Sequence, residues 1–257
     1  MKKEKKIEKT ISMAVVVVIL FLWYITTKAG IADPLLVPSP GKVWQSFLSV
    51  CGGYKGSSLW VHLGVSMKRL LISFGLAFIT AVPLGLLSGF SNRFRAALEP
   101  IIEFYRPLPP LAYYTLLVLA LGIGDESKIA LLFLACFAPI YVSCVSAVLR
   151  VKQDYINSAY TLGATKMQVF WDVIFPSCLP DMFTGLKTAI GVGYSTVVAA
   201  EMVAANKGIG WMVLDAKNWL RNDIVFVGII VMGITGILIS VFLNLLEKKL
   251  VPWSGKV

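Results

Sequence analysis

Few side chains in this sequence have the types and spacings that perform chemistry. His62 is the only histidine, and the four cysteines show no C-x-x-C spacing. A lone histidine excludes a histidine-clustered metal site, and the cysteine spacing indicates neither a metal site nor a disulfide framework. We therefore predict no metal, interpret His62 as a loop residue, and expect small hydrophobic behaviour from the three thiols in or beside apolar runs, which are Cys136, Cys144 and Cys178.

The motifs of hydrolytic enzymes are missing from the sequence. There is no G-x-x-x-x-G-K-[ST] stretch, so this chain is not expected to hydrolyse ATP. There is also no G-x-S-x-G or H-E-x-x-H stretch, and no histidine with a carboxylate cluster to move protons. The sequence therefore predicts a non-enzymatic function.

The composition indicates that the lipid bilayer is the solvent of this chain. Hydrophobic residues make up 57% of its 257 residues and charged residues only 15%, and the mean hydropathy is +0.78. A net charge of +10 could indicate nucleic-acid binding, but the basic residues cluster at both ends and beside apolar runs. That distribution is typical of membrane orientation. We predict an all-α, polytopic membrane protein that binds no nucleic acid.

Six apolar runs each approach the ~20 residues that span the hydrocarbon core. They cover residues 11–27, 69–90, 104–122, 129–149, 179–205 and 224–246. We therefore predict about six transmembrane helices. The expected segments are an N-terminus (1–10), a first transmembrane helix (11–27), a loop with a short helix (28–66), a five-helix core (67–249) that includes a cytoplasmic loop (150–180), and a tail (250–257).

The N-terminal region resembles the charged and apolar parts of a signal peptide. Only Gly30 and Ala32 offer a weak small-residue pair for cleavage, so we favour an uncleaved first helix, with cleavage as the rival interpretation. With the N-terminus in the cytoplasm, most of the 24 lysine and arginine residues fall in cytoplasmic segments. The positive-inside rule then places both termini in the cytoplasm.

Small residues recur every four positions in two of the runs. Such stripes let neighbouring helix backbones approach closely, and we interpret them as ordinary helix packing rather than a dimerisation motif. The residues are Ala77, Ala81, Gly85 and Gly89 in the second run and Gly185, Ala189 and Gly193 in the fifth.

The third run opens with an irregular segment, residues 105–110. Its three prolines remove amide donors and disfavour helix before them, so no regular helix can begin before Pro110. Irregular backbone at membrane depth is tolerated where it is buried or lines a wet cavity. The segment therefore either borders a translocation path or lies as a loop at the headgroup level.

The stretch between the fourth and fifth apolar runs, residues 150–180, is not apolar and has the pattern of two short helices. Residues 152–162 form the first, Gly163 stops it, and Thr165 with Gln168 makes a capping box that starts a second helix ending before Pro176. The second helix is apolar and lacks the base-reading side chains of a DNA-binding helix. It is therefore expected to pack against an apolar surface.

This stretch resembles the cytoplasmic loop of binding-protein-dependent ABC permeases, whose pattern is E-A-A, three residues, G, nine residues and I-x-L-P. Ala159, Gly163 and Pro176 match that pattern and its spacing. The family's glutamate, first alanine and leucine are replaced by Asn157, Ser158 and Phe175. The departure at Asn157 weakens any charge contact there.

The resemblance extends over nearly the whole chain, from residues 36–40 through 106–112, 122–124 and 197–210. It is strongest to the taurine, sulfonate and nitrate branch, and residues 191–201 with the closing Pro252 and Trp253 look most like taurine permeases. The resemblance implies a type I ABC importer permease fold in a bacterial cell membrane. It also implies alternating access for a small organic anion such as taurine or another sulfonate.

The same resemblance implies the partners of the chain. They are two ATP-binding subunits, a second permease copy that forms a homodimer, and an extracytoplasmic substrate-binding protein, with ATP and Mg used by the ATPase and no cofactor on this chain. A coupling helix with Ala159 and Gly163 exposed would seat in a groove of the ATPase. The implied coupling residues are Asn157, Ser158, Ala159, Leu162, Gly163, Ala164 and Pro176.

Glu201 is the one carboxylate in the apolar stretches after Asp181, and ionisable residues in a membrane are functional candidates. Repulsion argues against contact with an anionic substrate. We therefore expect a structural role, in which Glu201 pairs with Lys207 or caps neighbouring amides, with gating as the other hypothesis. The full set of candidates for a path or gate is Arg106, Pro107, Pro109, Pro110, Ser195, Thr196 and Glu201.

An ion-coupled secondary transporter is the main competing hypothesis. Such a protein would be expected to show membrane-buried carboxylates or an inverted repeat with paired broken helices. Neither pattern is evident in the sequence, so we favour the ATP-driven permease.

Overall fold

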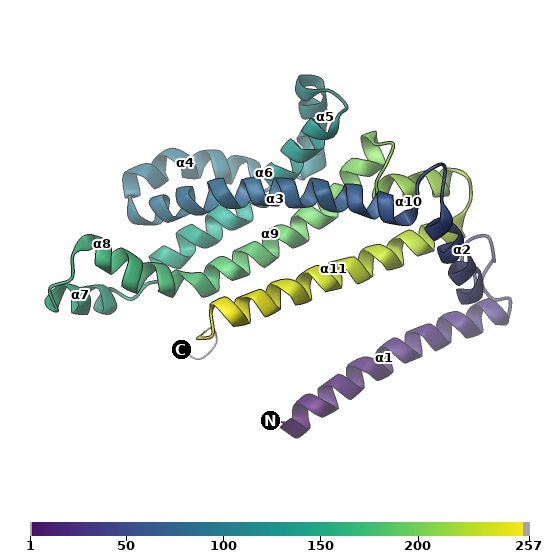
Figure 1. Cartoon of the computed structure of the whole chain (residues 1–257), viewed down its shortest axis with the longest axis horizontal. Coiled ribbons are helices and arrows are strands. Elements are labelled where there is room, and N and C mark those ends of the chain that lie inside the picture. Colours follow the sequence, from purple (N-terminus) through teal and green to yellow (C-terminus); the bar gives the residue numbers. More distant parts are fainter. Residues whose placement is uncertain (1, 254–257) are drawn as a thin grey trace. The chain divides into compact units, whose positions relative to one another are not determined.

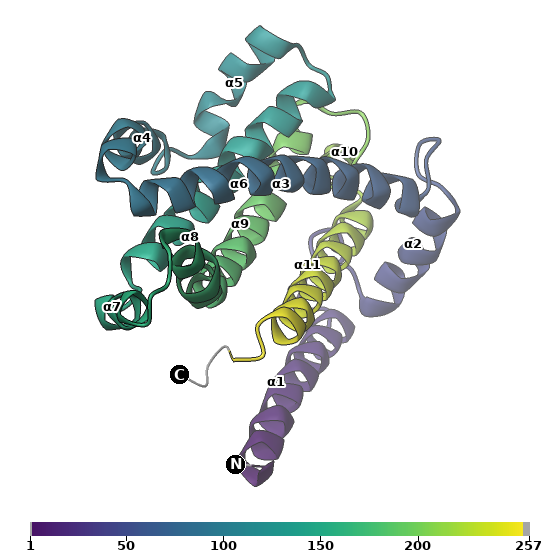
Figure 2. The same cartoon turned by 60° about the vertical axis from the view of Figure 1, so that its left-hand side comes forward.

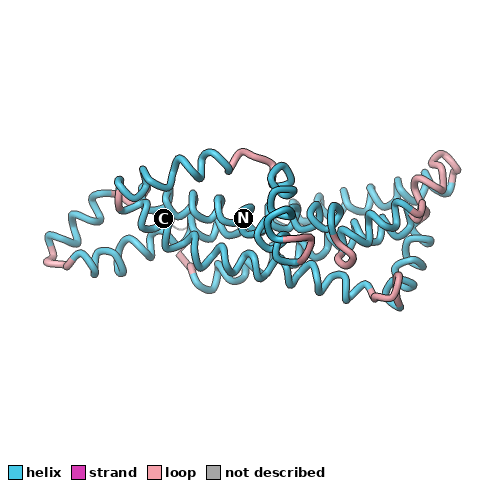
Figure 3. The backbone as a smooth tube through the Cα atoms, turned by 90° about the horizontal axis from the view of Figure 1, so that it is seen from above, coloured by secondary structure: helices cyan, strands magenta, loops and turns pink. Residues whose placement is uncertain are grey.

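A computed structural model describes the backbone of residues 2–253 and the side chains of residues 10–253. The described residues are almost entirely helical, with short connecting loops and one isolated β-bridge between Tyr54 and Ser57, which confirms the all-α class (Figures 1 and 3). The elements are α1 (Lys2–Lys28), α2 (Pro40–Gly52), α3 (Leu59–Phe90), α4 (Asn92–Tyr105), α5 (Pro110–Leu121), α6 (Asp125–Leu149), α7 (Gln153–Thr161), α8 (Lys166–Gln168), the π-helical turn η1 (Val169–Ile174), α9 (Phe175–Ala204), α10 (Ile209–Asn218) and α11 (Asn222–Leu250).

Fewer continuous spans are present in the described chain than the six predicted. Four helical stretches are long and apolar enough to cross a membrane, namely Thr10–Lys28, Leu59–Phe90, Asp125–Leu149 and Asn222–Leu250. The bent pair Lys166–Ala204 and Ile209–Asn218 brings the count to five. The run predicted at 104–122 is the difference, because α4 ends at Tyr105 and α5 has only 12 residues. Helix α5 does begin at Pro110, as the prolines predicted.

Backbone contacts divide the chain into two compact units. The first comprises Met1–His62 and Met212–Met232, and the second comprises Leu63–Trp211 and Gly233–Val257. We describe each unit by itself.

The first unit contains the predicted short helix in the loop after α1. Ser39 caps α2 by accepting a hydrogen bond from the Lys42 amide at 3.4 Å. The indole of Trp23 stacks on Phe226, with ring centroids 5.7 Å apart. The prediction that His62 is a loop residue is wrong, because α3 begins at Leu59 and His62 is fully buried within it.

Two aspartates, one in α10 and one in α11, accept hydrogen bonds from α2 and from the loop that follows it. Ser46 donates a hydrogen bond to Asp223 at 2.6 Å. Tyr54 and Lys55 both donate to Asp215, at 2.6 and 2.8 Å. Burial of the phenol raises the pKa of Tyr54, and the hydrogen bond to the Asp215 carboxylate raises it further, so the hydroxyl stays a donor at physiological pH.

The second unit is built around α6, against which α3 and α9 pack (Figure 2). A Cβ on Gly85 of α3 would lie 2.6 Å from the Cβ of Cys144 in α6. A Cβ on Gly193 of α9 would lie 2.6 Å from the sulfur of Cys136. Both small-residue stripes therefore serve helix packing, as predicted. The buried thiols Cys136, Cys144 and Cys178 belong to the same apolar core.

Polar contacts join α9 to α11 within the second unit. Lys187 forms an ion pair with Glu247, and the hydroxyls of Tyr194 and Thr235 are hydrogen bonded. These two contacts hold the long α9 against the C-terminal half of α11.

Candidate functional site

Helix α7 ends in a Schellman motif centred on Gly163. The amide of Ala164 donates to the Ala159 carbonyl at 3.0 Å, and the amide of Gly163 donates to the Tyr160 carbonyl at 2.9 Å. Gly163 has a φ of +86°, a left-handed conformation that costs glycine little. The sequence prediction of a helix that stops at this glycine is confirmed.

The capping box at Thr165 and Gln168 is also confirmed. The amide of Gln168 donates to the Thr165 hydroxyl at 3.4 Å, and the amide of Thr165 donates to the Gln168 side chain at 2.8 Å. This reciprocal pair starts α8 directly after the Gly163 turn.

The prediction that the second helix ends before Pro176 is wrong. The chain passes from α8 through η1 into α9 with no break, and Pro176 lies in the first turn of α9. Within this segment the amide of Phe175 donates to the carbonyl of Phe170, five residues earlier. A proline has no amide to donate, and the wider π turn takes up the resulting change of register. The loop is therefore continuous with the long apolar helix α9.

An exposed apolar surface covers the tip of this loop. Leu162, which follows α7, is 88% exposed, and Met167 is 66% exposed. Tyr155, Tyr160 and Trp171 are also exposed. We name these five side chains the loop-tip surface. Exposed apolar patches of this kind mark interaction sites.

The other implied coupling residues lie on and behind this surface. Asn157 and Ser158 are exposed on α7, and the Ser158 hydroxyl donates to the Asp154 carbonyl at 2.7 Å. Ala159 and Ala164 are half-buried against the core, which corrects the expectation that Ala159 is exposed. Helix α7 contacts η1, so the backing of this helix is the chain's own apolar core.

A groove of about 720 Å³ lies at the base of the loop. Pro176 and Asp172 line one part of it, and Arg150 and Trp253 line another. Trp253, from the C-terminal segment, thus reaches the region where η1 joins α9.

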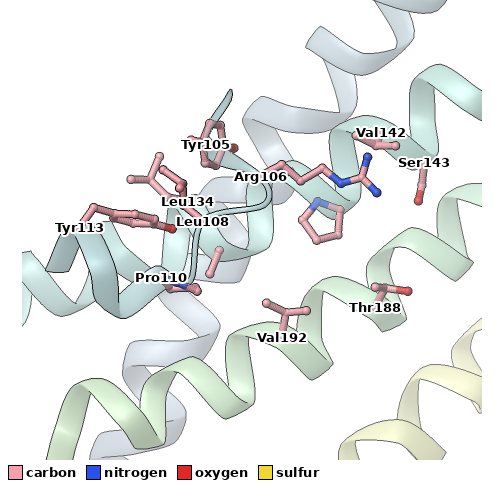
Figure 4. Close-up of a pocket in the computed structure, with 13 residues that line it drawn as sticks. Tyr105, Arg106, Leu108, Pro110, Tyr113, Leu134, Val142, Ser143, Thr188 and Val192 are labelled. Atoms are coloured by element: carbon pink, nitrogen blue, oxygen red, sulfur yellow. The ribbon is translucent and has the colours of Figure 1, made fainter. Parts of the chain in front are cut away.

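The break between α4 and α5 lines a cavity of about 330 Å³ (Figure 4). Arg106 extends over it toward Val142 and Ser143 of α6, while Thr188 and Val192 of α9 lie on another side. We name it the Arg106 cavity. Its other lining residues are Tyr105, Leu108, Pro110, Tyr113, Leu134, Ala135, Ala138 and Pro139.

Only part of the predicted path set meets at this cavity. Arg106 and Pro110 line it, whereas Pro107 and Pro109 are not among its lining residues. The hydroxyls of Ser195 and Thr196 both donate to the Val192 carbonyl, at 2.9 and 2.7 Å, and lie outside its lining. The irregular segment therefore borders a cavity, while Ser195 and Thr196 are engaged by their own helix.

Glu201 lies in a separate buried cluster with Arg69 as its cation. The guanidinium of Arg69 donates to Glu201 at 2.7 Å, and the two side chains are 5% and 0% exposed. Asp125, at the start of α6, accepts two further hydrogen bonds from Arg69, at 2.6 and 2.9 Å. Lys207 contributes only its backbone carbonyl, which accepts from Arg69 at 2.9 Å. Glu201 therefore forms its ion pair with Arg69 and not with Lys207, the partner predicted from the sequence.

The same cluster holds the turn between α9 and α10. The Gly210 amide donates to Glu201 at 3.0 Å, and Ser66 donates to Glu201 at 2.8 Å while accepting from the Ile209 amide at 3.0 Å. The turn fits closely, because a Cβ on Gly208 would overlap the Glu201 carboxyl. Amide capping by Glu201 is therefore present, and the geometry is that of a clamp joining α3, α6, α9 and α10.

Sequence reasoning missed Arg69 and Ser66. Arg69 stands at the start of the second apolar run, and the positive-inside count treats it as a residue of an outer loop. The structure instead buries Arg69 within a helix that begins at Leu59. An arginine just inside a long apolar run, with an unpaired carboxylate in another run, is the available signal.

Sequence and structure comparisons agree with this architecture. The chain is 41% identical over 250 residues to the taurine transport system permease protein TauC of Escherichia coli (strain K12), covering 96% of this chain and 91% of that protein. It is 30% identical over 238 residues to the putative aliphatic sulfonates transport permease protein SsuC of Bacillus subtilis (strain 168), covering 93% and 85%.

A solved structure titled as inward facing conformations of the MetNI methionine ABC transporter matches with a TM-score of 0.58 at 16% identity. The match covers 72% of this chain and 97% of that chain, and it shows a shared permease fold. Residues 81–252 match the family described as "Binding-protein-dependent transport system inner membrane component". This chain therefore belongs to the family of inner membrane components of binding-protein-dependent transport systems.

Proposed function

We propose that this chain forms the transmembrane path of an ATP-driven importer for taurine or another small organosulfonate. The family is that of non-catalytic ABC permease subunits, which work with an ATPase and a substrate-binding protein. The similarity over 96% of the chain to a taurine permease is the observation that carries the choice of substrate. Nearly the same share of the chain matches an aliphatic sulfonates permease, so the substrate class is wider than taurine.

The loop-tip surface is the docking site for the ATPase in this proposal. Its exposed leucine, methionine and aromatic side chains would be buried on association, which is a favourable use of apolar area. Because η1 continues without a break into α9, a push on the loop would be transmitted along a rigid helix. ATP and Mg would be bound by the partner ATPase and not by this chain.

The assembly in this proposal contains two copies of the chain and two ATP-binding subunits, with the substrate-binding protein on the outer face. Both termini lie in the cytoplasm. The secondary-transporter hypothesis is not favoured, because the buried carboxylate Glu201 is engaged by Arg69, the Ser66 hydroxyl and the Gly210 amide rather than held available for a coupling ion.

The docking proposal is tested by co-purification. A tagged chain, purified in mild detergent from its native host, is expected to retain an ATPase that carries a phosphate-binding loop. The Leu162→Glu variant is expected to lose most of that ATPase, because a charge would replace a side chain that is 88% exposed and contributes little to the fold. Mass spectrometry of the bound proteins gives the readout.

The matched control is Ile31→Glu, which places the same charge at another exposed position, in the loop after α1. This variant should keep the ATPase. A chain that purifies alone and imports taurine without ATP would overturn the proposal in favour of a secondary transporter.

A further inference from the structure

We infer that the Arg106 cavity is a binding site for the sulfonate group of the transported molecule. This inference rests on the proposed function and assigns its anion contact to named side chains. It also means that the permease itself, and not the binding protein alone, selects for an anion.

The first argument is the position of the cavity. It lies against Ala138 and Pro139, near the middle of the 25-residue helix α6, and against Thr188 and Val192, near the middle of α9. The middle of a membrane-spanning helix corresponds to the middle of the bilayer. A charged residue at that depth is costly and marks a functional site by default.

The second argument is the charge of the lining. Arg106 is the only charged residue among the lining side chains, and no carboxylate is present. In the described part of the chain, no ion pair or side-chain hydrogen bond engages its guanidinium. An arginine without an acidic partner in a membrane cavity lacks a counter-ion. A transported anion supplies one.

The third argument is the supply of hydrogen-bond donors. The hydroxyl of Tyr105, next to Arg106 in Figure 4, is buried and has no hydrogen-bond partner among the described residues. Ser143 adds a hydroxyl from α6, whereas the Thr188 hydroxyl of α9 already donates to the Thr184 carbonyl at 3.0 Å. A sulfonate has three acceptor oxygens, and a guanidinium can donate to two of them at once. The cavity thus offers more donors than its own chain uses.

The lining also provides acceptors for a positively charged end of a ligand. Pro139 has no amide, so the Ala135 carbonyl lacks the donor that it would have in a regular helix. That carbonyl and the hydroxyls of Ser143 and Thr188 can accept from an ammonium, but more weakly than a carboxylate would. The cavity is therefore built to select strongly for the anionic group and weakly for the amino group of a molecule such as taurine.

The first test is import by the complete transporter in proteoliposomes. Arg106→Gln is expected to lower the rate of taurine import at least about tenfold, because a charge-assisted pair is lost. Arg106→Lys keeps the charge and is expected to recover part of the rate. Arg93→Gln alters an exposed arginine of the preceding helix α4, away from the cavity, and is expected to import like the wild type.

The outcomes separate this inference from the proposed function. If the wild-type complex imports no sulfonate, the proposed function is wrong. A wild-type complex that imports, with an Arg106→Gln variant that imports within about twofold of it while retaining its ATPase, would overturn the inference alone.

The second test measures charge selectivity without any transport. In a chain whose four cysteines are replaced by alanine, Ser143→Cys is reacted with two thiol reagents of similar size, 2-sulfonatoethyl methanethiosulfonate and 2-(trimethylammonium)ethyl methanethiosulfonate. Each rate is divided by the rate of the same reagent with a small free thiol, because the attacking thiolate is an anion and reacts intrinsically faster with the cationic reagent. The normalised rate is expected to be several-fold higher for the sulfonate reagent, and Arg106→Gln is expected to abolish that preference. Equal normalised rates with Arg106 present, or no reaction with either reagent, would overturn the inference.

Discussion

At the scale of single residues, Arg69 and Glu201 show how a buried charge can be structural. Glu201 is completely buried, and its charge is balanced by Arg69 and by donors from Ser66 and Gly210. A buried pair of this kind adds little net stability over an apolar pair, but removing one partner is strongly destabilising.

Glu201→Ala is therefore expected to destabilise the chain by about 3–5 kcal/mol, because Arg69 would keep only the half-exposed Asp125 as a carboxylate partner. The measurement is the thermal midpoint of the purified complex in detergent, together with its import rate. Both should fall.

Glu126→Ala is the matched control, since Glu126 is an exposed glutamate next to Asp125 in α6. It should leave the midpoint unchanged. A Glu201→Ala complex that assembles, melts and imports like the wild type would exclude the structural role of Glu201.

The pairing of Glu201 could not be derived from the sequence, although the need for a partner could. Lys207 was the cation nearest along the chain, and the actual partner, Arg69, is 132 residues away. Sequence spacing predicts contacts within a helix or a turn, but not which distant helices meet. The amide capping of Glu201 was predictable because Gly210 lies only nine residues away.

At the scale of elements, the loop of residues 150–180 was the part most completely predicted. Its start and stop signals are local: Gly163 ends α7, and Thr165 with Gln168 begins α8. The fate of Pro176 was not predictable in this way, because the π turn that carries the helix past it depends on packing of the whole segment. The prediction of a third span failed because it was based on the apolar composition of residues 104–122. The prolines had predicted the break before Pro110, which leaves only the 12 residues of α5 as helix.

The loop also allows a test of backbone conformation that is independent of side-chain size. No heavy atom lies within 4 Å of a Cβ built on Gly163, so only its φ of +86° restricts substitution. Asparagine tolerates the left-handed region, whereas β-branched valine is strained there by about 1–3 kcal/mol. We expect Gly163→Asn to retain the co-purified ATPase and Gly163→Val to lose most of it.

Gly41→Val is the corresponding control, since Gly41 also has open space around its Cβ but has no positive φ. It should not affect the bound ATPase. If Gly163→Asn and Gly163→Val behaved alike, the Schellman turn would not be the feature that positions α7 for docking.

At the scale of the whole molecule, the distribution of charge and the position of the loop make one joint prediction of topology. The positive-inside rule places the termini in the cytoplasm, and the same topology puts α2 outside and residues 150–180 inside. Cys51 at the end of α2 is partly accessible, while the other three native cysteines are buried.

A membrane-impermeant maleimide should therefore label Cys51 in intact cells once the outer barrier is opened. With Cys51 replaced by serine, a Thr165→Cys variant should be labelled only after the inner membrane is permeabilised, because Thr165 lies exposed in the capping box of the loop. Labelling of Thr165→Cys from outside would show that the chain has the opposite topology to the one predicted. It would also separate the loop-tip surface from any cytoplasmic ATPase, and so remove the coupling role that this surface is proposed to serve.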